Sequence, residues 1–439
     1  MADVKAIGIG MIGCGTVGGG VAQLLRDHGE RYRKLLGRPV ELRRVLVRDA
    51  GKARDVRGLH GDCVTVDAEA FFQTPDVSII VEVAGGIEAA GGYVRRALES
   101  GRSVVTANKS LLAARGPELF KLAREKGVSI AFEASCGGGI PIVTAMCFGL
   151  MANQFSVIYG ILNGTCNYIL TEMSRFGRPY GEALEDAQRR GYAEADPTLD
   201  VSGRDAAEKL AILASLAFGV AARGEQVWSE GIEGLDTADI RFGAELDYEM
   251  KLLAIGERSG NGSVSLRVHP SFVHHDEALA QVSGTFNAVS VYGDAIGHTM
   301  YYGRGAGRAP TASAVVSDLL NVASGWYGRA FSGLRIWSDG AEAPMLTPRE
   351  ALTSRYYLRF NAKDVPGVLG KMTAILGARG ISISAVLQHE FNEGQFVPVV
   401  LVTHRAKQGA IDRALEEVAR LDAIQGVPVR VRIVDMPGG

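Results

Sequence analysis

Two charged residues near the middle of the chain are spaced so that they could bind and protonate a polar substrate. Asp205 and Lys209 are four residues apart in an expected helix, so they share one face, with the carboxylate first. Glu194, Asp196 and Asp200 lie just before them, and carboxylates clustered around a lysine suit a substrate with an ammonium group. A lysine brings a positive charge and a proton to an oxygen on which negative charge develops. A surface salt bridge explains the same spacing, so the sequence leaves that alternative open.

Two further charged residues follow expected strands. Lys109 comes after the strand expected at residues 103–106, and Glu133 comes after the strand expected at 128–132. Parallel sheets bind their ligands at the carboxyl ends of the strands, although Lys109 could instead cap a loop. Glu133 could act as a general acid or base, or as a ligand for a cation.

Thiols and imidazoles are weaker candidates. The cysteines are scattered without a C-x-x-C pair, which suggests reduced thiols and neither a disulfide framework nor a zinc site: Cys14, Cys63, Cys136, Cys147 and Cys166. Cys136 and Cys166 have no histidine near them in the sequence, so a thiol nucleophile is not favoured. Three histidines lack metal-ligand spacing with supporting carboxylates and are expected in loops: His269, His274 and His275.

A glycine-rich turn near the N-terminus is the element expected to position a cofactor. Gly13-Cys14-Gly15-Thr16-Val17-Gly18 follows the apolar run 6–12 and precedes an expected helix over 17–36. In such a G-x-G-x-x-G motif, Gly13 allows the tight turn, Gly15 lets the backbone approach a pyrophosphate, and Gly18 lets helix and strand pack closely. The helix N-terminus adds free N–H groups for the phosphates. The arrangement predicts a dinucleotide site, with a structural glycine turn as the alternative.

The second expected strand, over 40–47, bears on the choice of cofactor. It ends in Arg48-Asp49, at the position that faces the adenosine ribose, where an arginine accommodates a 2′-phosphate. Arg48, followed by Lys52 and Arg54, therefore favours NADP over NAD. A solvated basic loop is the alternative.

Strands alternating with helices predict an α/β fold whose first domain, residues 1–150, is a Rossmann-type parallel sheet. Five residues lie at the ends of its strands, and several of them are expected to line one crevice: Gly13, Arg48, Gly85, Lys109 and Glu133. An α+β substrate-binding and dimerisation domain is expected over 151–337, with a glycine-rich loop at 301–307 and residues 300–337 packing back on the first domain. A linker is expected over 338–353. Residues 354–439 follow the β-α-β-β-α-β order of a ferredoxin-like module.

Composition sets the broad class. Apolar residues make up 47% and charged residues 22% of 439, an ordinary globular balance, and the formal net charge of −2 gives no reason to expect nucleic acid or membrane as partner. We expect a cytoplasmic protein without a signal peptide or a membrane span.

Taken together, these motifs resemble homoserine dehydrogenase with a C-terminal ACT domain, over nearly the whole chain. The matching segments, in chain order, are 13–18, 105–109, 133–141, 191–197, 200–209 and 303–313. The resemblance implies reduction of L-aspartate 4-semialdehyde to L-homoserine with NADPH or NADH, and the reverse, in threonine, methionine and isoleucine biosynthesis. It implies Lys209 as the catalytic lysine, with Lys109 close to nicotinamide and substrate.

The resemblance also implies binding residues. The substrate would be held by carboxylates, namely Glu194, Asp200 and Asp205. The nucleotide would be contacted by Gly13, Gly15, Thr16, Val17, Gly18, Arg48, Lys109, Gly191, Gly305 and Gly307. A monovalent cation, usually sodium, would be bound by Glu133 and by the backbone of Cys136, Gly138 and Ile140. Position 136 is commonly valine in the family, but a carbonyl ligand tolerates the change.

The C-terminal module suggests regulation. In ACT modules the turn after the first strand, here Asp364 to Gly370, helps form an amino-acid site at a dimer interface. This implies feedback inhibition by L-threonine in a homodimer or homotetramer, with a purely assembling module as the alternative. Two rival functions are a non-catalytic amino-acid sensor, which predicts substitution of Lys109 or Lys209, and an aspartate-semialdehyde dehydrogenase, which needs a cysteine with a partnered histidine.

Overall fold

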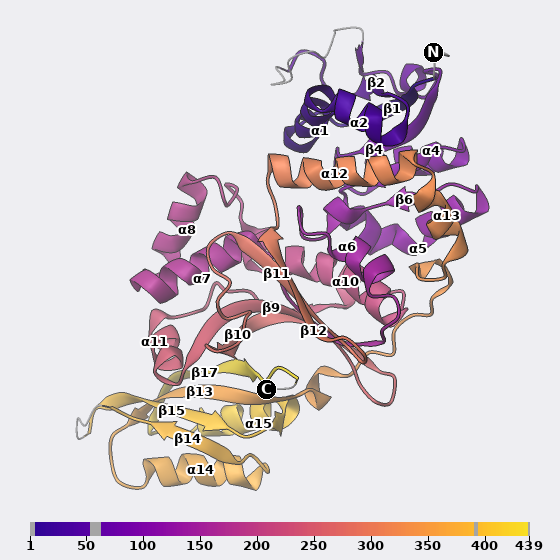
Figure 1. Cartoon of the computed structure of the whole chain (residues 1–439). Coiled ribbons are helices and arrows are strands. Elements are labelled where there is room, and N and C mark those ends of the chain that lie inside the picture. The colour runs from indigo at the N-terminus through magenta and orange to yellow at the C-terminus, as the bar shows by residue number, and fades with distance from the viewer. Residues whose placement is uncertain (1–4, 53–62, 390–393, 438–439) are drawn as a thin grey trace. The chain divides into compact units, whose positions relative to one another are not determined.

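The computed structural model describes residues 5–52, 63–389 and 394–437 (Figure 1). Arg54, one of the basic residues expected near the ribose, lies outside the described residues. The chain divides into two compact units. Unit 1 comprises residues 1–164, 204–228 and 285–344, and unit 2 comprises residues 165–203, 229–284 and 345–439.

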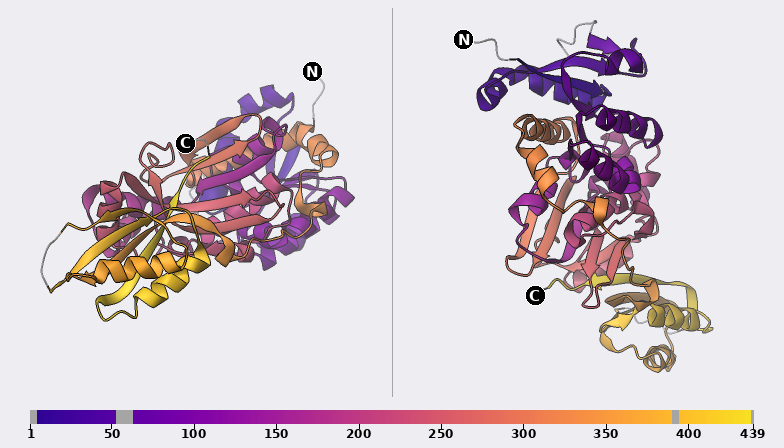
Figure 2. Two further views of the ribbon diagram at one scale, coloured as in Figure 1. Left: turned by 90° about the horizontal axis from the view of Figure 1, so that it is seen from below. Right: turned by 90° about the vertical axis from the view of Figure 1, so that its right-hand side faces the viewer.

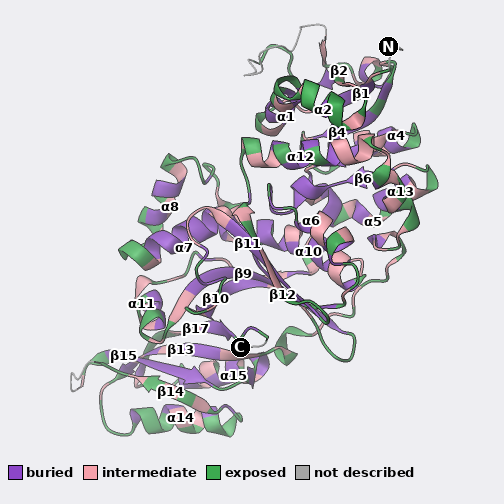
Figure 3. Ribbon diagram, viewed as in Figure 1, coloured by how far each residue is buried: buried purple, intermediate pink, exposed green. Residues whose placement is uncertain are grey.

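Unit 1 contains a parallel sheet of six strands in the order β3-β2-β1-β4-β5-β6. The strands are β1 (Ile7–Ile12), β2 (Val40–Leu46), β3 (Val64–Thr65), β4 (Val77–Glu82), β5 (Ser103–Thr106) and β6 (Ile130–Ala131). The order reverses between β1 and β4, and such switch points form the ligand crevice of doubly wound sheets. Both strands are almost wholly buried (Figure 3), as expected for a sheet covered on both faces. The predicted Rossmann-type sheet is confirmed.

Helices cover this sheet: α1 (Thr16–Asp27), α2 (Gly29–Leu36), α3 (Ala68–Phe72), α4 (Glu88–Glu99), α5 (Lys109–Glu125) and α12 (Arg308–Ala323). Helix α12 packs closely on α1. A Cβ at Gly20 would lie only 2.8 Å from the Cβ of Ala312, so the close approach requires glycine at position 20. The single helix predicted over 17–36 is wrong, since His28 separates α1 from α2. Residues 142–149 form a short helical turn, α6 (Ile142–Thr144), followed by the π-helical η3 (Ala145–Gly149).

The rest of unit 1 is built around three antiparallel strands in the order β12-β11-β7. These are β7 (Phe155–Ile161), β11 (Phe286–Gly293) and β12 (Gly297–Arg304), accompanied by α10 (Arg204–Phe218), α13 (Trp326–Gly333) and the turns η2 (Glu133–Ser135), η4 (Gly224–Gln226) and η5 (Ser338–Gly340). The glycine-rich loop predicted over 301–307 is only partly right. Its first four residues pair with β11, which leaves a shorter loop at 305–307.

Unit 2 contains a sheet in the order β9-β10-β17-β13-β15-β14. Its strands are β9 (Tyr248–Arg258), β10 (Val264–His274), β13 (Thr353–Lys363), β14 (Ile383–Leu387), β15 (Phe396–Thr403) and β17 (Ile424–Val434); the short β8 (Trp228–Ser229) and β16 (Ala406–Lys407) pair with β10 and β13. Its helices are α7 (Gly164–Phe176), α8 (Tyr180–Arg189), α9 (Thr198–Val201), α11 (Thr237–Glu245), α14 (Val368–Ala378) and α15 (Gln408–Val418), with the turn η6 (Arg349–Ala351).

The C-terminal part of unit 2 has the predicted β-α-β-β-α-β order, formed by β13, α14, β14, β15, α15 and β17. Helices α14 and α15 pack against the same face of this sheet (Figure 2). The core between them contains Tyr356, Leu358, Phe360, Met372 and Ile411, all fully buried.

This C-terminal module is joined to the rest of unit 2 through the sheet itself. Strand β17 pairs in parallel with β10, with Ser271 opposite Arg432. The buried carboxylate of Asp239 in α11 accepts hydrogen bonds from Tyr357 Oη at 2.9 Å and from Arg359 Nε at 2.6 Å. The module therefore shares buried polar contacts with residues far from it in sequence.

His269, expected in a loop, lies inside β10 and is fully buried, and His274 is the last residue of that strand. Long strand β9, which the sequence did not predict, pairs along the whole of β10. Among the described residues, no helix is long and apolar enough to cross a membrane. The proposed domain boundaries stay predictions.

Candidate functional site

The carboxylate of Asp205 lies between two lysine ammonium groups in unit 1. Asp205 Oδ2 accepts a hydrogen bond from Lys209 Nζ at 2.7 Å, and Asp205 Oδ1 lies 3.2 Å from Lys109 Nζ. Asn163 Nδ2 also donates to Oδ2, at 2.9 Å, and Lys209 Nζ donates to the carbonyl of Leu162 at 2.7 Å. The predicted Asp205–Lys209 pair is therefore no surface salt bridge, because both side chains are largely buried.

The electrostatics of the cluster keep Asp205 ionised. Burial would raise the pKa of its carboxyl, but the charges of Lys209 and Lys109 and the hydrogen bonds from Lys209 and Asn163 outweigh burial and lower the pKa to about 2. The negative charge in turn holds both ammonium groups at one place. A ligand oxygen entering there would meet charged donors in a partly desolvated site.

Lys109 is positioned by a network that begins on strand β4. The buried carboxylate of Glu82 accepts hydrogen bonds from the amide N–H of Ala84 at 2.9 Å and from Thr106 Oγ1 at 2.7 Å. Asn108 caps α5 by accepting from the amide N–H of Leu111, and its Nδ2 donates to the carbonyl of Gly86 at 2.7 Å. Lys109 is thus the first residue of a capped helix, so the position of its Cα and the direction in which its side chain starts are fixed.

The sequence did not identify Glu82, Asn108 or Asn163 as site residues. Glu82 ends an otherwise apolar strand, and a buried charge at a strand end was the available signal. Asn108 stands next to Lys109, which was identified, and both asparagines lie where a strand gives way to a helix, β5 to α5 for Asn108 and β7 to α7 for Asn163.

The glycine motif has the geometry of a dinucleotide turn. Gly13 has φ +93°, and a Cβ there would lie 2.7 Å from the backbone of Ala84. A Cβ at Gly18 would lie 2.4 Å from the carbonyl oxygen of Gly13, so this glycine allows the helix to pack on the strand. A Cβ at Gly15 would meet no described atom within 4 Å and would project into open space. The packing of the fold therefore requires glycine at positions 13 and 18, whereas Gly15 leaves room for a ligand at the N-terminus of α1.

A cleft of about 1270 Å³ opens over this turn. Of the predicted nucleotide residues, Gly13, Gly15, Thr16 and Arg48 line it, whereas Val17, Gly18, Lys109, Gly305 and Gly307 are not part of its lining. Further lining residues that the sequence did not assign to the nucleotide include Cys14, Asp49, Tyr93 and Arg308. The cleft is large enough for a dinucleotide, and the residues present fit that group.

The lining of the cleft is basic near the end of β2. Arg48, Lys52 and Arg308 all contribute to it, and the acidic Asp49 is turned to the backbone, accepting from the amide N–H of Gly51 at 2.8 Å. Cationic side chains at this position suit a phosphorylated ribose.

The turn predicted to bind a cation is buried and compact. Both carboxylate oxygens of Glu133 accept backbone hydrogen bonds, from the amide N–H of Val143 at 2.8 Å and of Thr144 at 2.7 Å. Burial raises the pKa of Glu133. The amide N–H of Glu133 donates to Asp318 at 2.8 Å. The side chain of Glu133 is therefore engaged in holding the turn, and a cation would be bound by carbonyl oxygens.

Glycines let this turn approach the loop at 305–307. Gly138 has φ +56°, and a Cβ there would lie 2.4 Å from the carbonyl oxygen of Gly305. Cys136 is fully buried, with its thiol 3.8 Å from the carbonyl oxygen of Lys209, and Ile140 is buried as well. Backbone carbonyl oxygens suit a hard cation such as sodium, and the cation role of these residues stays a prediction.

The two cysteines considered as nucleophiles, Cys136 and Cys166, are both buried. Burial raises the pKa of Cys136 to about 12, so its thiol stays protonated near neutral pH. Cys166 is also buried, and its thiol donates to the carbonyl of Asp200 at 3.2 Å. These findings agree with the expectation that neither cysteine provides covalent chemistry.

Three predicted site residues belong to unit 2. Gly191 has φ +73°, Glu194 is exposed, and Asp200 lies in α9. Their predicted contacts with cofactor and substrate stay predictions.

A basic dinucleotide cleft and a pair of partly buried lysines on one buried carboxylate, both in unit 1, place the chain among the NAD(P)-binding oxidoreductases. Comparison with known proteins is more specific. The family model described as homoserine dehydrogenase matches residues 141–320, its NAD-binding domain matches 13–133, and the ACT domain matches 356–421. The chain therefore belongs to the homoserine dehydrogenase family, whose members are oxidoreductases acting on a CH–OH group.

Individual relatives cover most or nearly all of the chain. Homoserine dehydrogenase of Pseudomonas aeruginosa is 42% identical and covers 98% of this chain and 99% of its own length. The crystal structure of a homoserine dehydrogenase from Thiobacillus denitrificans superposes with a TM-score of 0.91 at 41% identity, covering 98% of this chain and 99% of that one. A hyperthermophilic archaeal homoserine dehydrogenase in complex with NADPH is 26% identical, with a TM-score of 0.61, over 72% of this chain and 97% of that one.

Proposed function

We propose that this chain reduces L-aspartate 4-semialdehyde to L-homoserine with NADPH, and catalyses the reverse reaction, in the biosynthesis of threonine, methionine and isoleucine. The observation that carries the proposal is the Asp205 carboxylate held between Lys209 Nζ at 2.7 Å and Lys109 Nζ at 3.2 Å. This cluster offers what an emerging alkoxide needs, namely a fixed positive charge and a proton.

The residues of the cluster have separate roles in the proposed reaction. The bound cofactor supplies a hydride to the aldehyde carbon. Lys209 and Lys109 bind the aldehyde oxygen, and one of the two ammonium groups delivers the proton to it. Asp205 stays ionised because of the two lysines and orients both. In the reverse direction the same lysine takes the hydroxyl proton back, as microscopic reversibility requires.

The substrate carries its own ammonium and carboxylate groups, which need further partners. Glu194 and Asp200 would bind the ammonium group, and Asp205 would be close to it as well. A sodium ion bound by the backbone carbonyls of Glu133, Cys136, Gly138 and Ile140 would stiffen the turn beside the loop at 305–307. Support for this ion is the close approach of Gly138 to Gly305.

NADPH is the proposed physiological reductant. Support for the choice comes from Arg48, Lys52 and Arg308, which line one cleft, while Asp49 is bonded to the backbone. An acidic side chain free to bind the ribose 2′-hydroxyl would have favoured NADH.

Absorbance at the nicotinamide band tests the proposal. Purified protein should reduce NADP⁺ with L-homoserine, and reduce NAD⁺ more slowly, while L-threonine in place of homoserine should give no signal. Absence of reduction with either nucleotide would favour the non-catalytic sensor.

The ACT module is proposed to bind L-threonine and inhibit the enzyme, in a homodimer or homotetramer. Its turn after β13 is ordered, with Gly367 at φ +89° starting α14 and with Gln388 Nε2 3.3 Å from Asp364 Oδ1. Calorimetric titration of the whole enzyme with L-threonine should show saturable heat and a parallel loss of rate, and D-threonine should show neither. Heat without any loss of rate would leave an assembling module as the better description.

A further inference from the structure

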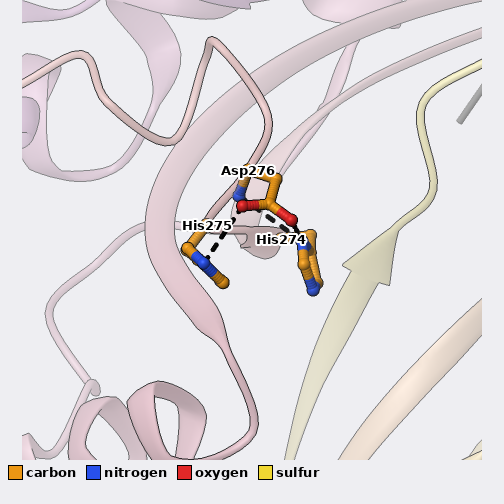
Figure 4. Close-up of side chains that lie close together, drawn as sticks. All are labelled: His274, His275 and Asp276. Atoms are coloured by element: carbon orange, nitrogen blue, oxygen red, sulfur yellow. Dashed lines mark hydrogen bonds and ion pairs between the residues drawn. The ribbon is translucent and has the colours of Figure 1, made fainter.

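Three consecutive side chains at the end of β10 form a cluster of metal-ligating atoms in unit 2. One ligand atom each from His274, His275 and Asp276 lies within 4.8 Å of the others (Figure 4). Asp276 Oδ1 is 3.1 Å from His275 Nε2, and Asp276 Oδ2 is 3.5 Å from His274 Nδ1. The carboxylate thus faces both imidazoles, one oxygen to each. The expectation that these histidines lack a supporting carboxylate is wrong.

Hydrogen bonds to the backbone indicate which ring nitrogens carry lone pairs. His275 Nδ1 lies 3.4 Å from the carbonyl oxygen of Asp247, which can only accept, so Nδ1 carries the proton and Nε2 a lone pair. The amide N–H of Asp276 donates to His274 Nδ1 at 3.4 Å, so that nitrogen is also an acceptor. In neutral histidines, both nitrogens that face the carboxylate therefore present lone pairs to it.

Acceptors that face one another need a cation between them. Two separate protons could bridge the two nitrogen–oxygen pairs, whereas one metal ion would satisfy all three groups. Backbone carbonyls that bind the second ring nitrogen are the usual way in which proteins orient a metal-binding histidine. Here the carbonyl of Asp247 has that role for His275.

We propose that His274, His275 and Asp276 form a binding site for a divalent transition metal ion of the zinc type. Imidazole nitrogen with one carboxylate suits Zn²⁺, Co²⁺ or Ni²⁺, whereas Mg²⁺ and Ca²⁺ prefer oxygen ligands only. Ligand atoms of a tetrahedral zinc site lie about 3.3 Å apart, given bonds of about 2.0 to 2.1 Å. The two nitrogen–oxygen separations are already close to that value, and rotation of the side chains would bring the three ligand atoms, now within 4.8 Å of one another, to it.

The backbone around the cluster is held in place. The amide N–H of His275 donates to the carbonyl of Asp247 at 2.9 Å, and Gln281 Nε2 donates to the carbonyl of His275 at 2.6 Å. The side chains themselves are 44% to 76% exposed, which leaves room for water ligands to complete the coordination. Asp247 Oδ1, 3.9 Å from His275 Nδ1, adds a second negative charge nearby.

Binding has a structural consequence. Asp247 lies between α11 and β9 and has φ +64°, a conformation that a residue other than glycine adopts only at a cost. A metal ion would fix the ring of His275 against the carbonyl of Asp247. It would therefore stabilise the corner between α11 and the start of β9, as well as the end of β10.

The site can be tested on the full-length enzyme after removal of bound metal with a chelator and dialysis. In a buffer with excess sodium and magnesium chloride, Co²⁺ titration should give visible d–d bands that saturate at one equivalent, without thiolate charge-transfer bands. Zn²⁺ should bind with the same stoichiometry by calorimetry and raise the thermal midpoint. His274→Gln and His275→Gln should each weaken binding at least tenfold.

A matched control is His404→Gln, which removes an exposed histidine after β15 in the same unit. It should bind Co²⁺ and Zn²⁺ as the native protein does. Thermal midpoints of all three variants without metal should agree with the native value, which separates lost binding from lost folding. Three results would each overturn the proposal. These are an absence of saturable binding, metal affinity in the His274 and His275 variants equal to that of the native protein, and thiolate bands that point to Cys14 or Cys63.

Discussion

Lys109 and Lys209 are a hundred residues apart in sequence, yet their ammonium groups meet on one carboxylate, at 3.2 Å and 2.7 Å from Asp205. Asp205→Asn keeps the size of the side chain and removes its charge, so the two ammonium groups would repel each other without compensation. We expect kcat to fall by roughly 10²- to 10³-fold, in the range of a lost acid–base contribution. Steady-state kinetics with homoserine and NADP⁺ measures the kcat of the variant and of the native protein.

Glu208→Gln is the matched control for this variant. Glu208 lies on the same helix and accepts a hydrogen bond from Ser110 Oγ at 2.8 Å. Its substitution should change kcat by less than about threefold, as for other polar contacts that the reacting atoms do not touch. Equal effects of the two variants would mean that Asp205 acts only as a structural residue.

Substitutions at two glycines of the nucleotide turn are expected to have different effects. Gly15→Ala adds a methyl group to the open cleft, so it should raise the Kd for NADPH by about tenfold or more while leaving the thermal midpoint unchanged. Gly18→Ala places a Cβ 2.4 Å from the carbonyl oxygen of Gly13, so it should destabilise the protein by about 1 to 3 kcal/mol. Fluorescence titration and thermal unfolding of both variants check the contrast. A large loss of stability in Gly15→Ala would contradict the assignment of open space to the cofactor.

Arg48 should determine the preference for a phosphorylated cofactor. A charge-assisted hydrogen bond contributes about 1.5 to 3 kcal/mol, so Arg48→Ala should raise the KM for NADPH by roughly 10- to 100-fold and change the KM for NADH little. Arg33→Ala, which removes an exposed arginine on α2, is the control and should change neither. A proportional rise for both cofactors in Arg48→Ala would show that Arg48 does not bind the 2′-phosphate.

The buried Lys251 is expected to make the free energy of unfolding depend on pH. Its side chain is buried, Nζ donates to the carbonyl of Val282 at 2.8 Å, and burial lowers the pKa to about 8. A folded pKa below the unfolded one means that the unfolded state binds more protons, so stability rises with pH between about 8 and 10.5. Below pH 8 the charged group destabilises the folded state fully.

Lys251→Met should therefore stabilise the protein near pH 7 by up to about 3 kcal/mol, and the gain should disappear by about pH 10.5. The carbonyl of Val282 keeps a hydrogen bond from Asn167 Nδ2 at 3.3 Å in the variant. Chemical unfolding at several pH values measures the difference, with Lys371→Met, on an exposed face of α14, as control. A gain that is constant across this pH range would show that burial does not lower the pKa of Lys251.

Much of the fold was predictable because its signals are local. The glycine turn, the apolar runs of β1 and β4 and the alternation of strands and helices lie within short windows, and together they specify a doubly wound sheet. The C-terminal β-α-β-β-α-β order was predictable for the same reason. Strand β9 was missed because its residues are buried on both faces, which removes the two-residue alternation of a half-buried strand.

The candidate site was predictable only residue by residue. The spacing of Asp205 and Lys209 places them on one face of α10, but the approach of Lys109 and Asn163 to Asp205 is a tertiary contact that no spacing encodes. The Glu82 network was missed because a buried charge is paired by backbone N–H groups, which have no sequence signature. The cluster of His274 and His275 was also missed. The turn after β10 directs the Asp276 carboxylate toward both rings, and the sequence does not show that direction.

The proton-donating role of the lysine pair is tested most directly by the pH dependence of kcat for Lys209→Ala and Lys109→Ala, with Lys121→Ala, an exposed residue of α5, as control. We predict that at least one of the first two loses roughly 10²-fold or more in kcat, that a small primary amine added to the buffer restores part of the rate, and that the control is unchanged. Native-like turnover in both Lys209→Ala and Lys109→Ala would contradict the account.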